Sequence, residues 1–189
     1  KSTQIKFICD YLQAKGINVV LTREPGGTDL GEKIRQLLLS TQTQPMHSDS
    51  ELLLMFAARN EHIHHKIIPA LKKGDWVLSD RFTDASYAYQ GGGRGLDIER
   101  IEHLERWVLG DFTPDMTLLL DIPVDLGMSR VESRGEKDRI ELEAKDFFER
   151  VRQAYIARSE KYPERIKLID SSKEREHTST QIEQILATL

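Results

Sequence analysis

The chain has 189 residues, enough for one domain with a sizeable core, and its 39% hydrophobic and 31% charged residues exclude a fibrous or disordered protein. Its net charge of −4 comes without a long basic run, which argues against duplex nucleic acid as the main ligand. No apolar run reaches the roughly 18 residues of a membrane span, and the first residues lack the apolar region of a signal peptide, so we expect a cytoplasmic protein without a membrane partner.

Helices and short strands alternate in the first part of the chain. Apolar residues at helical spacing predict a helix over residues 3–15, which Gly16 ends. The β-rich run INVVLT predicts a strand over residues 17–22, followed by the glycine turn of REPGGT and a second helix over residues 29–39. A long helical segment is predicted over residues 48–74.

The second part of the chain continues the alternation. Its predicted elements are strand 76–80, a short helix, the glycine cluster QGGGRG, helix 97–109, strand 116–122, a helix from Pro123, the charged loop ESRGEKDRIE, helix 144–162, strand 166–170 and helix 178–189. This pattern predicts one α/β domain over residues 1–189, a parallel sheet flanked by helices. Ligands bind such sheets at the carboxyl ends of the strands, where this sequence places REPGG, DRF, DIP and DSS.

Lys1, Ser2 and Thr3 stand directly before the first predicted helix. They match the second half of a P-loop, G-x-x-x-x-G-K-[ST], in which the lysine reaches nucleotide phosphates and the hydroxyl ligates Mg²⁺. The same tripeptide is also an ordinary helix N-cap. On the P-loop interpretation, we expect a strand and a glycine-rich turn, on the order of a dozen residues, to precede Lys1 in the protein, with that strand at the centre of the sheet.

Asp80 and Arg81 follow a buried strand, WVLSD. In P-loop enzymes a carboxylate at this place orients the magnesium shell, and an adjacent arginine offers a planar fork to a phosphate. The alternative is a surface ion pair. The position directly after a buried strand favours the functional interpretation.

Two kinds of polar residue stand out in the long helical segment. Arg59 interrupts an apolar stripe, and a buried guanidinium needs a partner, which a phosphate, a base edge or a structural carboxylate would supply. We favour a ligand. His62, His64 and His65 lack the further side chains that would complete a metal site, and we expect them to be exposed helix residues.

The charged loop carries Arg134 and Arg139. A solvated charged loop is the ordinary interpretation of such a stretch. In phosphoryl transfer, a mobile lid brings arginines onto the transferring group and excludes water, and the loop is a candidate for that role.

In their order, the stretches KST, TREPGGT, LLLMFAAR, DRFTDASYAYQGGGRG and SRGEKDRIE resemble the bacterial thymidylate kinase family over essentially the whole chain. The resemblance implies transfer of the γ-phosphoryl group of ATP to dTMP, giving dTDP in dTTP synthesis, with Mg²⁺. It also implies the P-loop nucleoside-monophosphate-kinase fold, with four of five parallel strands visible here, a lid over about residues 132–142 and a homodimer.

Individual roles follow from the resemblance alone. It places ATP at Lys1, Ser2, Thr3, Arg130 and Arg134, and the metal at Ser2 and Asp80. It places dTMP at Arg35, Met55, Phe56, Arg59, Arg81, Ser86, Tyr89 and Gln90. The catalytic set is Lys1, Glu24, Arg81, Arg134 and Arg139.

The sequence departs from the family pattern at two positions. The aromatic residue that stacks on thymine commonly lies four residues before the helix arginine, where this chain has Met55, while Phe56 lies three before it. Glu132 stands in the lid where related sequences often carry another arginine. We therefore expect Arg134 and Arg139 to contribute more to the function of the lid.

Two alternative functions remain at this point. One is another small P-loop kinase that acts on a different nucleoside monophosphate or on a nucleoside. The other is a non-catalytic nucleotide-binding module, which the combination of Lys1, Asp80, Arg81 and the lid arginines argues against.

Overall fold

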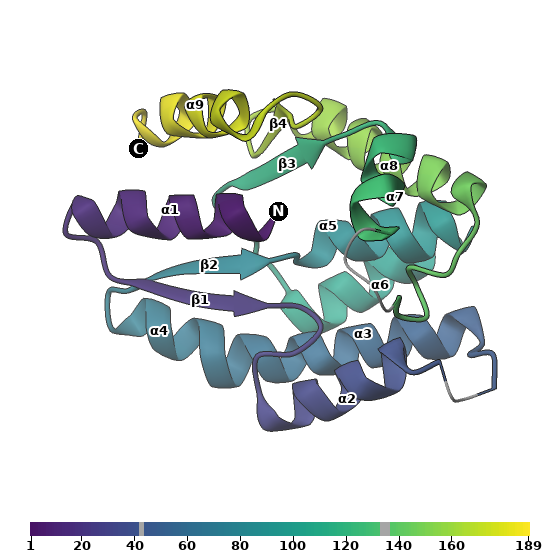
Figure 1. Ribbon diagram of the computed structural model, residues 1–189. Helices are drawn as coiled ribbons and strands as arrows, with labels where there is room; N and C mark the ends of the chain where they lie inside the picture. Colours follow the sequence, from purple (N-terminus) through teal and green to yellow (C-terminus); the bar gives the residue numbers. More distant parts are fainter. Residues whose placement is uncertain (42–43, 133–136) are drawn as a thin grey trace.

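The computed structural model describes residues 1–41, 44–132 and 137–189. Its four strands are β1 (Val19–Arg23), β2 (Trp76–Asp80), β3 (Thr117–Asp121) and β4 (Ile166–Asp170). The chain crosses between them through helices, and all the strand pairs are parallel (Figure 1). The predicted α/β class with a parallel arrangement of strands is therefore confirmed.

The strands form two separate pairs. In the first pair Val19 lies opposite Trp76, and in the second Thr117 lies opposite Ile166. Within the described residues, β2 and β3 share no ladder of hydrogen bonds. Side-chain packing joins the two pairs instead, because Leu78 of β2 lies in the same apolar cluster as residues of β3 and β4.

The helices are α1 (Ser2–Ala14), α2 (Asp29–Leu39), α3 (Ser48–His62), α4 (Ile68–Lys72), α5 (Thr83–Ser86), α6 (Ile98–Leu109), α7 (Val124–Glu132), α8 (Lys145–Lys161) and α9 (Arg175–Leu186). Two further segments are π-helical, η1 (Ile63–Ile67) and η2 (Tyr87–Gly93). The described part contains no helix that is long and apolar enough to cross a membrane.

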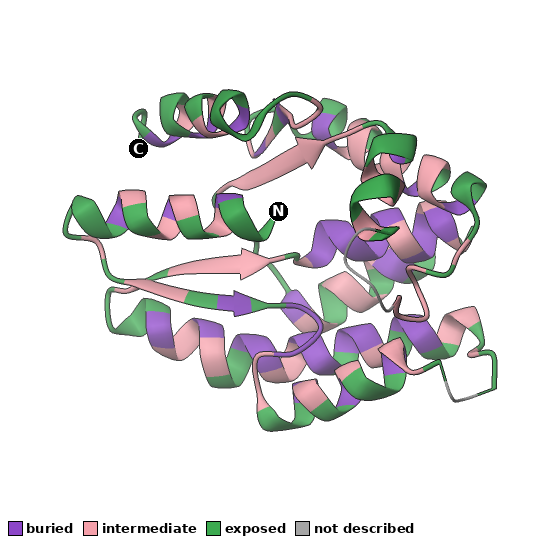
Figure 2. Cartoon of the chain, viewed as in Figure 1, coloured by how far each residue is buried: buried purple, intermediate pink, exposed green. Residues whose placement is uncertain are grey.

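Helices cover both faces of the strands. Adjacent strand residues point to opposite faces. Leu78 packs into the cluster of α1 and α9, whereas Val77 packs into a cluster with Ile63 and Ile67 of η1. Figure 2 shows how the buried residues gather where α3, α5 and η2 meet, next to the carboxyl end of β2.

The predicted long helix over residues 48–74 is not a single α-helix. It divides into α3, η1 and α4, and Pro69 lies in the first turn of α4. A proline has no backbone N–H and its ring crowds the preceding turn, so it interrupts a regular α-helical ladder. The wider π-helical turn directly before Pro69 is a common form of such an interruption.

The glycine cluster QGGGRG lets α8 approach η2 closely. A Cβ atom on Gly92 would lie 2.6 Å from Ala154 Cβ, and one on Gly93 would lie 2.5 Å from a ring carbon of Phe147. The contact with α8 therefore requires glycine, which has no side chain, at positions 92 and 93. This contact also sets the position of η2, which carries Tyr89 and Gln90.

We expect the substitution Gly92→Ala to destabilise the protein by about 1–3 kcal/mol, because its methyl group overpacks the contact with α8. Thermal or urea unfolding measures the change. Gly127→Ala is the matched control, since its Cβ would meet only Ile122 Cγ2, at 3.7 Å. Equal stability of the two variants would show that α8 does not need this close approach.

Candidate active site

Lys1 and Asp80 meet at the carboxyl end of β2. Lys1 Nζ lies 2.7 Å from Asp80 Oδ1, and the Lys1 side chain is 45% exposed. Glu24 N donates to the backbone carbonyl of Asp80 at 3.0 Å, which ties the segment after β1 to the end of β2. Ser2 and Thr3 follow Lys1 in the exposed first turn of α1. The structure thus brings together the two charged residues that the sequence assigned to phosphate and metal.

Two arginines add positive charge beside this pair. Arg35 of α2 donates from Nη1 to the Pro25 carbonyl at 3.0 Å. Burial, together with the charges of Arg23 and Arg81, lowers the pKa of Arg35 from its ordinary value. Burial and the charge of Arg81 likewise lower the pKa of Lys1, in spite of its ion pair with Asp80. Such mutual repulsion is relieved by a bound anion.

Arg81 has an uncommon backbone conformation. Its φ angle is 75°, and it is the one non-glycine residue with positive φ in the part of the chain that the structure describes. Ser79 Oγ donates to the Arg81 carbonyl at 2.7 Å, and the Arg81 guanidinium lies 5.4 Å from the centre of the Tyr89 ring, with Nη2 3.4 Å from Tyr89 Oη. A left-handed arginine next to a strand end is a strained arrangement of the kind found at functional sites.

Glu24 is the centre of a buried charged cluster. Its carboxylate accepts from Arg59 Nε at 2.8 Å and lies 3.0 Å from His62 Nδ1. The Glu24 side chain is 2% exposed, and both of its oxygens are engaged. The resemblance placed Glu24 near the reacting phosphates; here its side chain is turned into the protein and holds Arg59 and His62.

Arg59 finds the structural partner that the sequence left open. Besides Glu24, its Nη1 donates to Ser86 Oγ at 3.1 Å. The guanidinium lies 4.6 Å from the ring centre of Phe56 and 5.6 Å from that of Phe82. A structural carboxylate therefore supports Arg59 in this structure, and the ring of Phe56 packs against it.

The expectation that His62 is exposed is wrong. His62 is fully buried, and its Nε2 lies 2.6 Å from Thr22 Oγ1. Because Nδ1 faces the Glu24 carboxylate, it carries a proton, and in the neutral imidazole Nε2 accepts from Thr22. The signal that was missed is the spacing, since His62 lies one turn after the buried Arg59.

The other residues assigned to the base are also buried in the structure. Met55 packs against Ile34 and Leu38 of α2, on a different side of α3 from Phe56. Gln90 donates from Nε2 to Glu51 at 2.8 Å. Gln90 therefore lies between η2 and α3, whereas Met55 faces α2.

Of the two arginines predicted in the lid, the structure describes Arg139. Arg134 lies outside the described residues. Arg139 donates from Nε to the Leu38 carbonyl at 2.7 Å and from Nη2 to Glu51 at 2.6 Å, so the far end of the predicted lid rests on α2 and α3. Arg130 donates to the Ser171 carbonyl at 3.3 Å, beside the carboxyl end of β4.

Glu51 is a site residue that the sequence did not reveal. On the sequence it is one of two acids in the first turn of a helix, which stabilise a helix N-terminus in any protein. In the structure it receives hydrogen bonds from three residues, Gln90, Arg94 and Arg139, which come from two segments distant in sequence. Only the tertiary contacts distinguish it from its neighbour Asp49.

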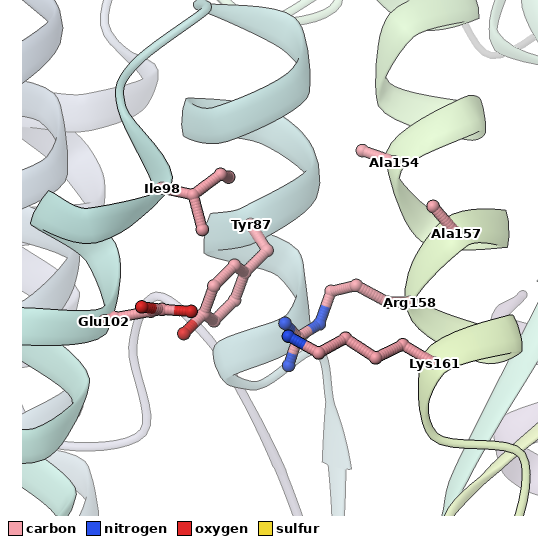
Figure 3. A pocket seen from close by; sticks show the side chains of 7 residues that line it. All are labelled: Tyr87, Ile98, Glu102, Ala154, Ala157, Arg158 and Lys161. Carbon is pink, nitrogen blue, oxygen red and sulfur yellow. The ribbon is translucent and has the colours of Figure 1, made fainter.

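A cavity of about 220 Å³ lies elsewhere, between α8 and the segment formed by η2 and α6 (Figure 3). Tyr87 and Arg158 point toward each other across it, with the guanidinium 3.6 Å from the ring centre. None of the residues predicted for ATP, dTMP or metal lines this cavity. The candidate active site is therefore the charged region at the ends of β1 and β2.

Comparisons with known proteins identify the family of this chain. The family model described as thymidylate kinase matches residues 1–182. Thymidylate kinases of Ruthia magnifica subsp. Calyptogena magnifica and Nitrosospira multiformis are 75% and 49% identical to this chain over 189 residues, all of this chain and 92% of each relative. The crystal structure of thymidylate kinase from Ehrlichia chaffeensis matches with a TM-score of 0.78 and 33% identity, covering 98% of this chain and 91% of that one. The chain belongs to the thymidylate kinase family.

Proposed function

We propose that Lys1, Arg35, Asp80 and Arg81 hold the reacting phosphates while this chain phosphorylates dTMP to dTDP, the reaction of its family. The observation that carries the proposal is that Lys1, Arg35 and Arg81 lie close enough to repel one another at the ends of β1 and β2, where Lys1 pairs with Asp80. We take residues 1–189 as one kinase domain with a lid over about residues 132–142. The cytoplasm, where nucleotides are made, is the compartment that we propose.

Phosphoryl transfer requires two polyanionic substrates to lie in line while their mutual repulsion is cancelled. In our proposal Lys1 turns from Asp80 to the phosphates of ATP, with Ser2 and Thr3 at the first turn of α1. Arg81 offers its planar fork to the phosphate of dTMP, and Arg35 approaches the same group from α2. Arg130, Arg134 and Arg139 act on the ATP side and at the lid.

Asp80 and Ser2 fit a magnesium ion. Mg²⁺ prefers oxygen ligands and usually keeps several waters, so one carboxylate and one hydroxyl suffice when substrate phosphates complete the shell. The carboxylate of Asp80 lies beside Lys1, where those phosphates are expected. When bound, the ion would neutralise charge on the phosphate oxygens.

For dTMP we propose a site between α3 and η2. Arg59, Ser86 and Gln90 offer polar groups to the base, Phe56 offers apolar surface, and Tyr89 packs beside the sugar. Met55 packs against α2, so we assign the apolar contact with the base to Phe56. Glu24 takes a positioning role in this proposal, because its buried carboxylate is engaged by Arg59 and His62.

We expect the substitution Arg81→Ala to lower kcat for dTMP phosphorylation by about 100-fold or more, since it removes a charged donor from the transferring group. Arg81→Lys should recover only part of the loss, because an ammonium lacks the planar fork. A coupled assay of ADP formation on the full-length protein gives the rates. Lys33→Ala, which removes an exposed cation from α2, is the control and should leave kcat unchanged.

The same assay separates the alternative functions when dTMP, dUMP, CMP and AMP are compared. The proposal requires dTMP to be the best acceptor. A preference for another monophosphate would assign the chain to a different small kinase, and no ADP formation with any acceptor would favour a non-catalytic nucleotide-binding module. Near wild-type activity of Arg81→Ala would refute the role of Arg81 alone.

We also propose a homodimer whose interface includes α3 and α6. These helices pack on each other, and each exposes a large apolar residue, Leu53 at 56% and Trp107 at 82%. An isolated tryptophan with that exposure is costly in water and is typical of an interface.

We expect the substitution Trp107→Glu to convert the dimer into a monomer, because it places a charge in the apolar contact. Sedimentation equilibrium measures the molecular mass. Leu189→Glu changes another exposed apolar residue, which lies outside α3 and α6, and should leave the dimer intact. A wild-type monomer would refute the dimer, and a dimeric Trp107→Glu variant would place the interface elsewhere.

A further inference from the structure

The buried carboxylate of Glu51 accepts four hydrogen bonds from three residues, Gln90, Arg94 and Arg139. The residue is 1% exposed and lies in the first turn of α3. Its Oε1 accepts from Gln90 Nε2 at 2.8 Å and from Arg94 Nε at 3.3 Å. Its Oε2 accepts from Arg139 Nη2 at 2.6 Å and from Arg94 Nη2 at 3.2 Å. One carboxylate thus joins α3, η2 and the far end of the predicted lid.

The surroundings keep Glu51 ionised. Burial alone would raise its pKa, but the hydrogen bonds from Gln90, Arg94 and Arg139 outweigh burial, and the pKa lies below its ordinary value. An ionised carboxylate can only accept hydrogen bonds. The amide of Gln90 must therefore turn its NH₂ group toward Glu51, and the opposite orientation would set two acceptors against each other.

Because the NH₂ group of Gln90 faces Glu51, its carbonyl oxygen Oε1 can accept a hydrogen bond from another group. Gln90 Oε1 is buried and has no hydrogen-bond partner among the described residues. A buried carbonyl oxygen without a partner is unfavourable, and a ligand N–H that reached it would remove that cost. Ser86, one turn earlier, accepts from Arg59 of α3, so the Arg59 guanidinium lies against the turn that precedes Gln90.

Thymine and cytosine differ in the hydrogen-bonding groups that they present to the Gln90 carbonyl oxygen and the Arg59 guanidinium. Thymine carries an N–H at ring position 3 between two carbonyl oxygens, whereas cytosine has an unprotonated acceptor nitrogen at that position. A carbonyl acceptor facing position 3 accepts from thymine and repels cytosine. Arg59 uses three of its five N–H groups within the protein and has donors left for a carbonyl of the base.

We propose that Glu51 is a positioning residue for base selection: it locks the Gln90 amide so that Oε1 faces the ring N–H of the acceptor base. The inference rests on the proposed function, in which Gln90 contacts that base. Glu51 itself does not touch the substrate. Its effect is to turn a side chain that could donate or accept into a fixed acceptor.

The test is the ratio of kcat/KM for dTMP to kcat/KM for dCMP in the Glu51→Gln variant of the full-length protein. A glutamine at this position can donate or accept, so Gln90 becomes free to flip. We expect the ratio to fall about tenfold, through a higher KM for dTMP and faster turnover of dCMP.

Glu143→Gln is the matched control. It removes the other carboxylate that binds Arg94 and leaves the bond between Glu51 and Gln90 in place. Its selectivity should equal that of the wild type. A similar loss in this variant would attribute the effect to Arg94 and would refute the proposal.

Gln90→Leu gives a second measurement that does not depend on the folding of Glu51→Gln. It removes the acceptor and should lower the same ratio, and adding Glu51→Gln to it should cause no further loss of selectivity. If Glu51→Gln folds and keeps the ratio within twofold of wild type, or if Gln90→Leu retains it, the inference is wrong. The proposed function has its own readout, phosphorylation of dTMP by the wild type, and survives either result.

Discussion

The buried contact between Glu24 and Arg59 fixes the geometry on which the candidate site depends. It joins the end of β1 to α3, and through Ser86 and the carbonyl of Phe82 it reaches the segment after β2. Removing one partner from a buried pair of this kind typically costs about 3–5 kcal/mol, because the other charge stays buried without compensation. The cluster is stable because almost every polar group in it has a partner, including His62, which joins Glu24 to Thr22.

The arginines of the molecule fall into two groups that serve different purposes. Arg94, Arg152, Arg158 and Arg165 each pair with a carboxylate, and these pairs hold helices to the strands or to one another. Arg35 and Arg81 have no carboxylate within ion-pair distance among the described residues. Burial and the charges of both arginines lower the pKa of Lys1, which pairs with Asp80, so positive charge is concentrated where the strands end. In a structural network, acids of the protein neutralise the cations. At a phosphate site, cations without such a partner can bind the anionic ligand.

Local patterns in the sequence predicted much of the fold. The strands predicted over residues 76–80 and 166–170 agree with β2 and β4, and the other two differ by one or two residues at each end. The pattern also placed Asp80 at a strand end, where it meets Lys1. These features depend on periodicity and on the order of elements, which a single sequence contains.

The features that were missed depend on partners far along the chain. His62 and Glu51 are ordinary helix residues by local criteria, and only contacts with Glu24 and Gln90 give them their roles. The π-helical segments η1 and η2 were likewise not predicted, because an apolar stripe at helical spacing does not distinguish a π-helical turn from an α-helical one.

Arg81 shows why the site combines a strained backbone with an ordered side chain. A left-handed conformation costs a non-glycine residue on the order of 1 kcal/mol, and here the bond from Ser79 to the Arg81 carbonyl helps to hold it. The strained turn directs the guanidinium over Tyr89, which η2 holds against α8 through Phe147 and Tyr155. An arginine that is already ordered loses less side-chain entropy when it binds a phosphate than a mobile one does. The close packing of the glycine-rich η2 on α8 thereby contributes to the alignment of a charge at the far end of β2.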